Sequence, residues 1–178
     1  SANNNGNDSE WINADAAIKI LEAANVPVGL PPGNHDMGAN ASDTGNTPLT
    51  ASFNNWFGVS RFSGRPYYGG HYSTTNDNHY DLFTAGGMEF IVIYFAYDTS
   101  ATGTRFQGVL AWADAALKKY SNRRAILVSH YILNSGNPSS PVNRTNIPRT
   151  CGSCHSGPFV AFQSSKMFAL LEAGNPDV

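Results

Sequence analysis

The sequence predicts an α/β domain, because helical patterns alternate with short apolar runs that lead into polar loops. A helix is predicted to begin after Asp8 or Ser9, either of which can cap it, and to run to about Ala24. Val26–Leu30 has the length and composition of a short buried strand, and it leads into the turn-forming stretch Pro31–Asp36. In open α/β sheets the site lies beyond the carboxyl ends of the strands, so this loop is a candidate site.

The middle of the chain is predicted to contain a long irregular segment and then a hairpin. Met37–Thr75 has no clean period and is rich in Gly, Asn, Ser and aromatic residues. In a compact domain such a segment is usually functional. Strands are predicted at Tyr80–Ala85 and Met88–Tyr97, joined at Gly86 and Gly87 as a hairpin.

The rest of the chain continues the α/β alternation. Helical spacing of apolar residues predicts a helix between Val109 and Tyr120, and Ala125–Ser129 has the pattern of another buried strand. A second long loop is expected at 134–156, followed by a helix that ends at Ala173, and Asp177 resembles the start of a further strand. No internal repeat or second domain is evident, so residues 1–178 are interpreted as one domain.

Composition and charge exclude several classes of protein. The chain has 178 residues, of which 41% are hydrophobic and only 13% are charged, with 11 basic against 13 acidic residues. A net charge of −2 argues against nucleic-acid binding by bulk electrostatics. The longest apolar run, Phe90–Tyr97, is too short to cross a bilayer. Low charge together with abundant Asn and Gly favours a secreted or periplasmic protein.

Gly33-Asn34-His35-Asp36 is the strongest local motif, because it directly follows the first predicted strand. An Asn carbonyl is a hard oxygen ligand, and a neutral imidazole suits zinc, iron or manganese. A neighbouring Asp can also orient a His or raise its pKa, which makes the His a better proton donor. A polar turn without chemistry is the alternative interpretation.

His130 ends the predicted strand Ala125–Ser129. A His at the carboxyl tip of a strand is expected to point into the same crevice as the Gly33–Asp36 loop. Alone it would be interpreted as a core residue. Two such strand tips in one sheet favour a shared site.

These two motifs resemble the third and fourth motifs of the calcineurin-like metallophosphoesterases. The stretches VPVGLPPGNHD, NHYDLF, GMEFIVIYFAYD and LAWADAALKKYSNRRAILVSHYIL are similar to the exported bacterial branch of that family, and the similarity runs from about Glu10 over almost the whole chain. The resemblance implies a two-sheet α/β sandwich flanked by helices. It also implies a binuclear site that holds two divalent or trivalent ions of the zinc, iron or manganese class and hydrolyses phosphate mono- or diesters.

The resemblance implies a role for each residue that matches the family's motifs. Asn34 and His130 correspond to ligands of one metal ion. His35 corresponds to the residue that contacts the phosphate and protonates the leaving group, and Asp36 to its partner. In such a site a metal-bound hydroxide attacks phosphorus in line.

Several motifs of the family are absent from the chain. Asp-x-His and Gly-Asp-x-x-Asp or -Asn are expected before residue 10, and Gly-His-x-His after the strand that starts at Asp177. Residues 1–178 are therefore expected to be a partial catalytic domain, truncated at both ends and inactive in isolation. A chain that opens with Ser1 is in keeping with a missing upstream segment.

Two further histidines and an aromatic stretch have other interpretations. Gly70-His71-Tyr72-Ser73 begins like the last family motif but lacks its second His, so His71 is expected to be a loop residue near substrate. His79 opens a predicted strand and is expected to pack at the surface. The aromatic residues between Phe53 and Tyr72 are expected to line a substrate cleft or to belong to the core.

Cys151-Gly-Ser-Cys154-His155 has the spacing of a c-type haem attachment site. A local disulfide or a small metal clip that includes His155 fits an irregular loop equally well. The alternative function is therefore a non-catalytic or electron-transfer module that carries covalently bound haem. A visible absorption spectrum distinguishes this module from a phosphoesterase.

Overall fold

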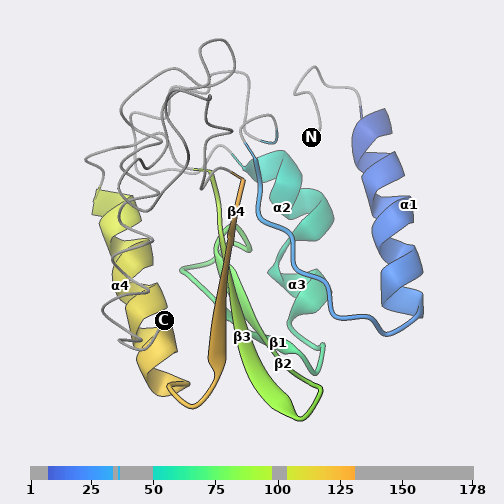
Figure 1. Ribbon diagram of the computed structural model, residues 1–178. Helices are drawn as coiled ribbons and strands as arrows, with labels where there is room; N and C mark the ends of the chain where they lie inside the picture. The colour runs from blue at the N-terminus through green and yellow to red at the C-terminus, as the bar shows by residue number, and fades with distance from the viewer. Residues whose placement is uncertain (1–7, 34–35, 37–49, 98–103, 131–178) are drawn as a thin grey trace, which may run out of the picture. The chain divides into compact units, whose positions relative to one another are not determined.

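The computed structural model describes residues 8–33, 36, 50–97 and 104–130, and they form a mixed α/β fold, as predicted (Figure 1). The chain divides into two compact units. One contains the sheet together with α1 (Ser9–Ala23), α2 (Ala51–Phe57) and α3 (Val59–Phe62). The other contains α4 (Thr104–Lys119).

The sheet has four strands in the order β1-β2-β3-β4: β1 (Tyr68–His71), β2 (His79–Ala85), β3 (Met88–Phe95) and β4 (Arg124–Ser129). β2 pairs antiparallel with both β1 and β3, whereas β4 pairs parallel with β3. The predicted hairpin and last strand are therefore confirmed. Ile126 of β4 is 42% exposed, however, so this strand is less buried than its apolar sequence suggests.

Local geometry explains two of the confirmed boundaries. Gly86 and Gly87 connect β2 to β3 with φ values of 56° and 76°, a conformation that glycine adopts at no steric cost. Asn25 ends α1 with a φ of 53°, and the N–H of Val26 bonds back to the carbonyl of Leu21. A left-handed residue followed by such a bond is a common helix terminus.

The predicted strand at Val26–Leu30 is wrong, because the segment is irregular and only partly buried. Pro27 and the following Pro31 and Pro32 have no N–H with which to pair with a neighbouring strand. Gly29 instead lies directly against the ring of Tyr94 on β3, where an added Cβ would be 2.2 Å from the ring. The segment therefore packs against side chains of the sheet without joining it.

The predicted irregular segment at Met37–Thr75 is wrong in part. Residues 37–49 lie outside the described residues, but residues 50–75 contain α2, α3 and β1. Helices of seven and four residues are too short to show the periodicity on which sequence-based recognition depends. Their apolar side chains nevertheless form the core between the helices, which consists of Phe53, Phe57 and Phe62 packed with Trp11 of α1.

An ion-pair cluster also joins α1 to α3. The Arg61 guanidinium of α3 donates two hydrogen bonds to the Glu22 carboxylate, at 2.9 and 3.0 Å, and one to Asp15 at 2.7 Å. The same guanidinium lies over the Phe57 ring, 4.9 Å from its centroid. The hydrogen bond from Arg61 lowers the pKa of Glu22. The cluster fixes α1 on the core that α2 and α3 complete.

The predicted helix near Val109–Tyr120 is confirmed as α4, which begins at Thr104. Its buried residues follow one stripe: Phe106, Val109, Ala113, Ala116 and Leu117. On its exposed side Lys118 pairs with Asp114 one turn earlier, at 2.6 Å. The helix is amphipathic, as its apolar spacing predicts.

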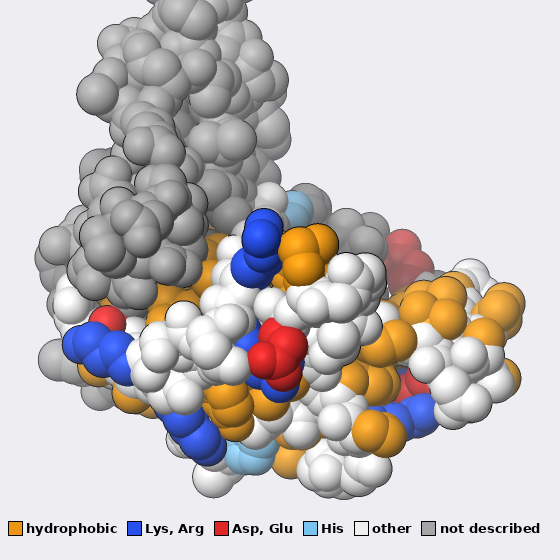
Figure 2. Space-filling view, turned by 60° about the horizontal axis from the view of Figure 1, so that its bottom comes forward, with side chains coloured by type: hydrophobic (Ala, Val, Ile, Leu, Met, Phe, Trp, Pro, Cys, Tyr) orange, Lys and Arg blue, Asp and Glu red, His pale blue; other side chains and the backbone are white. Residues whose placement is uncertain are grey.

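Two features of the surface bear on the expected partners. No helix in the described part of the chain is long and apolar enough to cross a membrane. On the face shown in Figure 2, Lys and Arg side chains lie singly among acidic, polar and hydrophobic ones, so the coloured residues of this face form no continuous basic surface. The absence of a nucleic-acid partner stays a prediction.

Candidate functional site

The candidate site lies at the carboxyl ends of the parallel strands β3 and β4. Parallel pairing places Phe95 beside Ser129, so the residues that follow them leave the sheet at the same edge. The N–H of Tyr97, just after β3, donates a hydrogen bond of 2.9 Å to the carbonyl of Pro32. This bond holds the start of the Pro31–Asp36 loop against the strand tips.

Gly33 and His130 are in direct contact at this edge. A Cβ added to Gly33 would lie 3.0 Å from Nδ1 of His130 and 3.3 Å from its Cε1, so the imidazole ring rests on the glycine backbone. The Tyr97 ring meets the same imidazole edge-on, with 5.8 Å between ring centroids. The structure thus brings together the loop and the strand tip that the sequence places far apart.

Asp36 closes the loop on itself. One of its carboxylate oxygens accepts a hydrogen bond from the Gly33 N–H at 2.8 Å. Its own N–H donates to the Gly33 carbonyl at 3.1 Å. Gly33 and Asp36 are therefore joined by two hydrogen bonds, one of which depends on the Asp36 side chain.

Two of the four predicted site residues, Asn34 and His35, lie outside the described residues. The described residues Asp36 and His130 both contact Gly33, the first through a hydrogen bond and the second through its ring. No group of three or more His, Cys, Asp or Glu side chains placed to hold a metal occurs within the described ranges. Of the two predicted metal ligands, the structure describes His130. Its imidazole is exposed, and imidazole nitrogen is a ligand that suits zinc, iron or manganese.

The contact between Gly33 and His130 predicts the result of a substitution. Gly33→Ala places a methyl group against the imidazole, so we expect the His130 ring to move by a few tenths of an ångström. The chemical shifts of the His130 ring protons measure this displacement. Stability should change by less than about 1 kcal/mol, because the exposed ring can yield and alanine restricts the unfolded chain.

Gly64→Ala is the matched control, since nothing lies within 4 Å of a Cβ added there. It should leave the His130 resonances unchanged. Identical spectra for Gly33→Ala and the wild type would show that the two residues are not in contact.

His79 is buried, and its expected surface position is wrong. The side chain is 2% exposed, and its ring stacks on Tyr94 with 4.6 Å between centroids. Nδ1 lies 2.9 Å from the Asn76 carbonyl oxygen, to which a protonated Nδ1 donates. Burial lowers the pKa of His79 to about 4, so the ring is neutral at physiological pH.

The turn before His79 is fixed by a buried polar network. Asp77 accepts hydrogen bonds from the Thr50 hydroxyl at 2.7 Å and from the Asn54 amide at 2.6 Å. Asn76 donates to the Phe57 carbonyl at 2.9 Å and accepts from the Tyr68 hydroxyl at 2.7 Å. The network ties the turn before His79 to α2.

Asp81 is a second buried ionisable group on that face. It pairs with Tyr68 of β1 and Val92 of β3, and it is 2% exposed. Burial raises the pKa of Asp81 to about 7, although the Tyr94 hydroxyl offsets part of this rise. The alternation of polar and apolar residues in His79-Tyr80-Asp81-Leu82 suggests that His79 and Asp81 face water, and for this reason sequence reasoning missed them.

Of the remaining residues singled out in the sequence, the structure describes His71 and the aromatic residues but not the cysteine motif. His71 is the last residue of β1 and pairs with His79 of β2, so its expected position in a loop is wrong. Of the aromatic residues expected in a cleft or in the core, Phe53, Phe57 and Phe62 belong to the core. The motif from Cys151 to His155 and the elements predicted after His130 lie outside the described residues, so the haem alternative stays a prediction.

Comparison with known proteins gives one relative of undescribed activity. No family model matches the chain, and no solved structure matches it. Among curated proteins, the chain is similar to "Uncharacterized protein YvnB" of Bacillus subtilis (strain 168), with 34% identity over 131 residues. These residues are 73% of this chain and 9% of YvnB. The chain is therefore similar to a short part of a much longer protein.

Proposed function

We propose that the chain is part of a metal-dependent phosphoesterase that hydrolyses phosphate mono- or diesters. The observation that supports this most is the contact of the His130 ring with Gly33, beside the turn that Asp36 closes. This contact joins the two motifs that resemble the metallophosphoesterases, Gly33-Asn34-His35-Asp36 and Ser129-His130. It lies at the carboxyl ends of parallel strands, where α/β sheets carry their sites.

His130 and Asn34 are the residues that would hold metal in this chain. An exposed imidazole and an amide oxygen are compatible with an ion of the zinc, iron or manganese class. Two bound ions would supply Lewis-acid activation of water and of the phosphate oxygens. The further ligands, and the second sheet of the proposed two-sheet sandwich, would come from outside the described residues. Secretion or export of the protein remains part of the proposal.

His35 would contact the phosphate and protonate the leaving group, and Asp36 would position it. The turn geometry supports a positioning role for Asp36, because its carboxylate already fixes the loop backbone through the Gly33 N–H. Loss of this bond would let the loop that carries Asn34 and His35 change shape. Replacement of Asp36 would therefore be expected to disturb both Asn34, the proposed metal ligand, and His35, the proposed proton donor.

The test is metal-dependent hydrolysis by the full-length natural protein, with the 178-residue chain assayed beside it. We expect the full-length protein to hydrolyse 4-nitrophenyl phosphate or its bis-ester. Chelation should abolish the activity, and zinc, iron or manganese should restore it. The 178-residue chain, which lacks most of the expected ligands, should be inactive. Hydrolysis that survives complete metal removal, or its absence with every metal tested, would contradict the proposal.

A further inference from the structure

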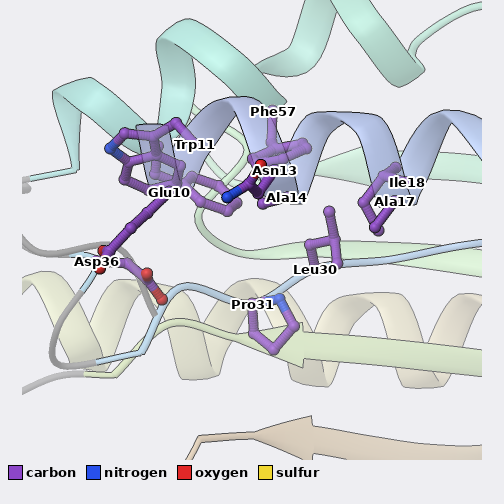
Figure 3. Close-up of a pocket in the computed structure, with 11 residues that line it drawn as sticks. Glu10, Trp11, Asn13, Ala14, Ala17, Ile18, Leu30, Pro31, Asp36 and Phe57 are labelled. Atoms are coloured by element: carbon purple, nitrogen blue, oxygen red, sulfur yellow. The ribbon is translucent and has the colours of Figure 1, made fainter. Parts of the chain in front are cut away.

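A pocket of about 480 Å³ lies beside the candidate site, between α1 and the segment that contains Leu30 and Pro31 (Figure 3). Its size falls within the range of about 300–1,000 Å³ that is usual for small-molecule sites. Asp36 belongs both to this pocket and to the Gly33–Asp36 turn. A ligand in the pocket would therefore lie next to the loop to which we assign the phosphate.

The walls of the pocket are mostly apolar, and three of the lining residues are aromatic. Trp11 of α1 and the α2 residues Phe53 and Phe57 supply rings that are otherwise buried in the core. Ile18 and Leu30 supply aliphatic surface. The rings of Phe53 and Phe57 pack on one another, with 5.8 Å between their centroids.

The charged groups of the pocket are all acidic. Glu10 and Asp36 reach toward the same end of it, as Figure 3 shows, and Asn13 is the third polar residue of the lining. No Lys or Arg is among the described residues that line it. Two carboxylates repel a phosphate group, and apolar walls strengthen their field by excluding water. The pocket is therefore unsuited to the phosphate of a substrate.

We propose that this pocket binds an apolar organic cation, which forms the alcohol part of a phosphate ester substrate. The proposal rests on the proposed phosphoesterase function for the presence of the ester. Aromatic faces attract cations through their ring electrons, and Trp does so most strongly. The carboxylates of Glu10 and Asp36 add charge complementarity. The alkyl groups of a substituted ammonium ion would lie against the apolar lining, to which Ile18 and Leu30 contribute together with the exposed edges of the aromatic rings.

Three soluble probes of nearly the same shape test the proposal by binding alone. Choline is the cation, 3,3-dimethyl-1-butanol is its neutral isostere, and 3,3-dimethylbutanoate is the anion. Binding to the 178-residue chain is followed by the indole N–H resonance of Trp11, assigned with Trp11→Phe. We expect choline to bind at least about fivefold more tightly than the neutral isostere, and the anion not to bind.

Variants of α1 distinguish binding in the pocket from binding elsewhere on the chain. Glu10→Gln should weaken choline binding by about threefold or more and leave the neutral isostere unchanged, since only the charge is removed. Ala17→Leu should abolish binding of both probes, because Ala17 lines the pocket. Ala16→Leu is the matched control, an exposed alanine of the same helix that does not line the pocket, and it should bind like the wild type.

Equal affinity for choline and its neutral isostere, or equal effects of Ala16→Leu and Ala17→Leu, would overturn the inference. Its failure is distinguishable from that of the proposed function. A full-length protein that hydrolyses phosphate esters while the chain shows no preference for the cation refutes the pocket assignment alone. Selective choline binding by a protein without metal-dependent hydrolysis supports the pocket and refutes the phosphoesterase.

Discussion

Replacement of Asp81 by Asn is expected to remove a contribution to stability that, by itself, falls by about 4 kcal/mol between about pH 4 and pH 7. Burial raises the pKa of Asp81 from 3.8 in the unfolded chain to about 7 in the folded chain. Each unit of this difference corresponds to about 1.4 kcal/mol. The groups that face Asp81 from the neighbouring strands are the phenols of Tyr68 and Tyr94, which ionise only at much higher pH.

The direction in which Asp81 changes stability with pH follows from proton binding. Between about pH 4 and pH 7 the folded chain holds a proton on Asp81 that the unfolded chain has released. The contribution of Asp81 to stability is therefore fully present below pH 4 and is lost by about pH 7. Urea unfolding of wild type and Asp81→Asn at half-unit pH steps gives the difference directly. A difference that does not vary with pH would contradict the assigned burial.

Replacement of His79 by Gln is expected to remove a contribution to stability that rises with pH, by about 3 kcal/mol between about pH 4 and pH 6.5. Burial lowers the pKa of His79 from 6.5 to about 4, so between these values the unfolded chain binds the additional proton. Its contribution to stability is present above about pH 6.5 and is lost as the pH falls to about 4. The variant also loses stacking on Tyr94, but that loss does not depend on pH.

In the wild type the pH-dependent contributions of Asp81 and His79 to stability have opposite signs and nearly cancel. Each single variant removes one contribution and so shows the pH dependence of the other. The free energy of unfolding of the wild type should change little between pH 4.5 and pH 6.5. Over the same range Asp81→Asn should gain stability with rising pH, and His79→Gln should lose it. The double variant should again be nearly flat. Parallel pH profiles for the two single variants would show that the two groups are not buried as described.

Elements with strong local signals could be predicted from the sequence. The glycine pair Gly86 and Gly87 determines the hairpin by its backbone conformation, and the apolar stripe of α4 is long enough to show a helical period. The strand predicted at Val26–Leu30 followed from its apolar composition, but Pro27 within the segment already argued against it. The contact of Gly29 with Tyr94, which is distant in the sequence, was not predictable.

The position of the candidate site was predicted for a reason that is right for one of its two parts. His130 does follow a strand, but the Pro31–Asp36 loop does not, and the hydrogen bond from the Tyr97 N–H to the Pro32 carbonyl holds the start of this loop at the strand tips instead. That Gly33 is the residue on which the His130 ring rests depends on the register of β3 and β4, which the sequence does not specify. The burial of His79 depends on the rings of Tyr68 and Tyr94 that stack on it from the neighbouring strands, and the sequence does not specify this pairing.

The proposed function divides two roles between histidines: His130 would bind metal, and His35 would donate a proton. It is tested most directly in the full-length protein by elemental analysis together with kcat for 4-nitrophenyl and phenyl phosphate. His130→Ala should lose bound metal and activity together, with partial rescue by excess metal. His35→Ala should keep its metal and lose about 10²–10⁴-fold in kcat for phenyl phosphate. Its loss should be smaller for the 4-nitrophenyl ester, whose leaving group needs little protonation. If His35→Ala loses metal as completely as His130→Ala, the assigned roles are wrong.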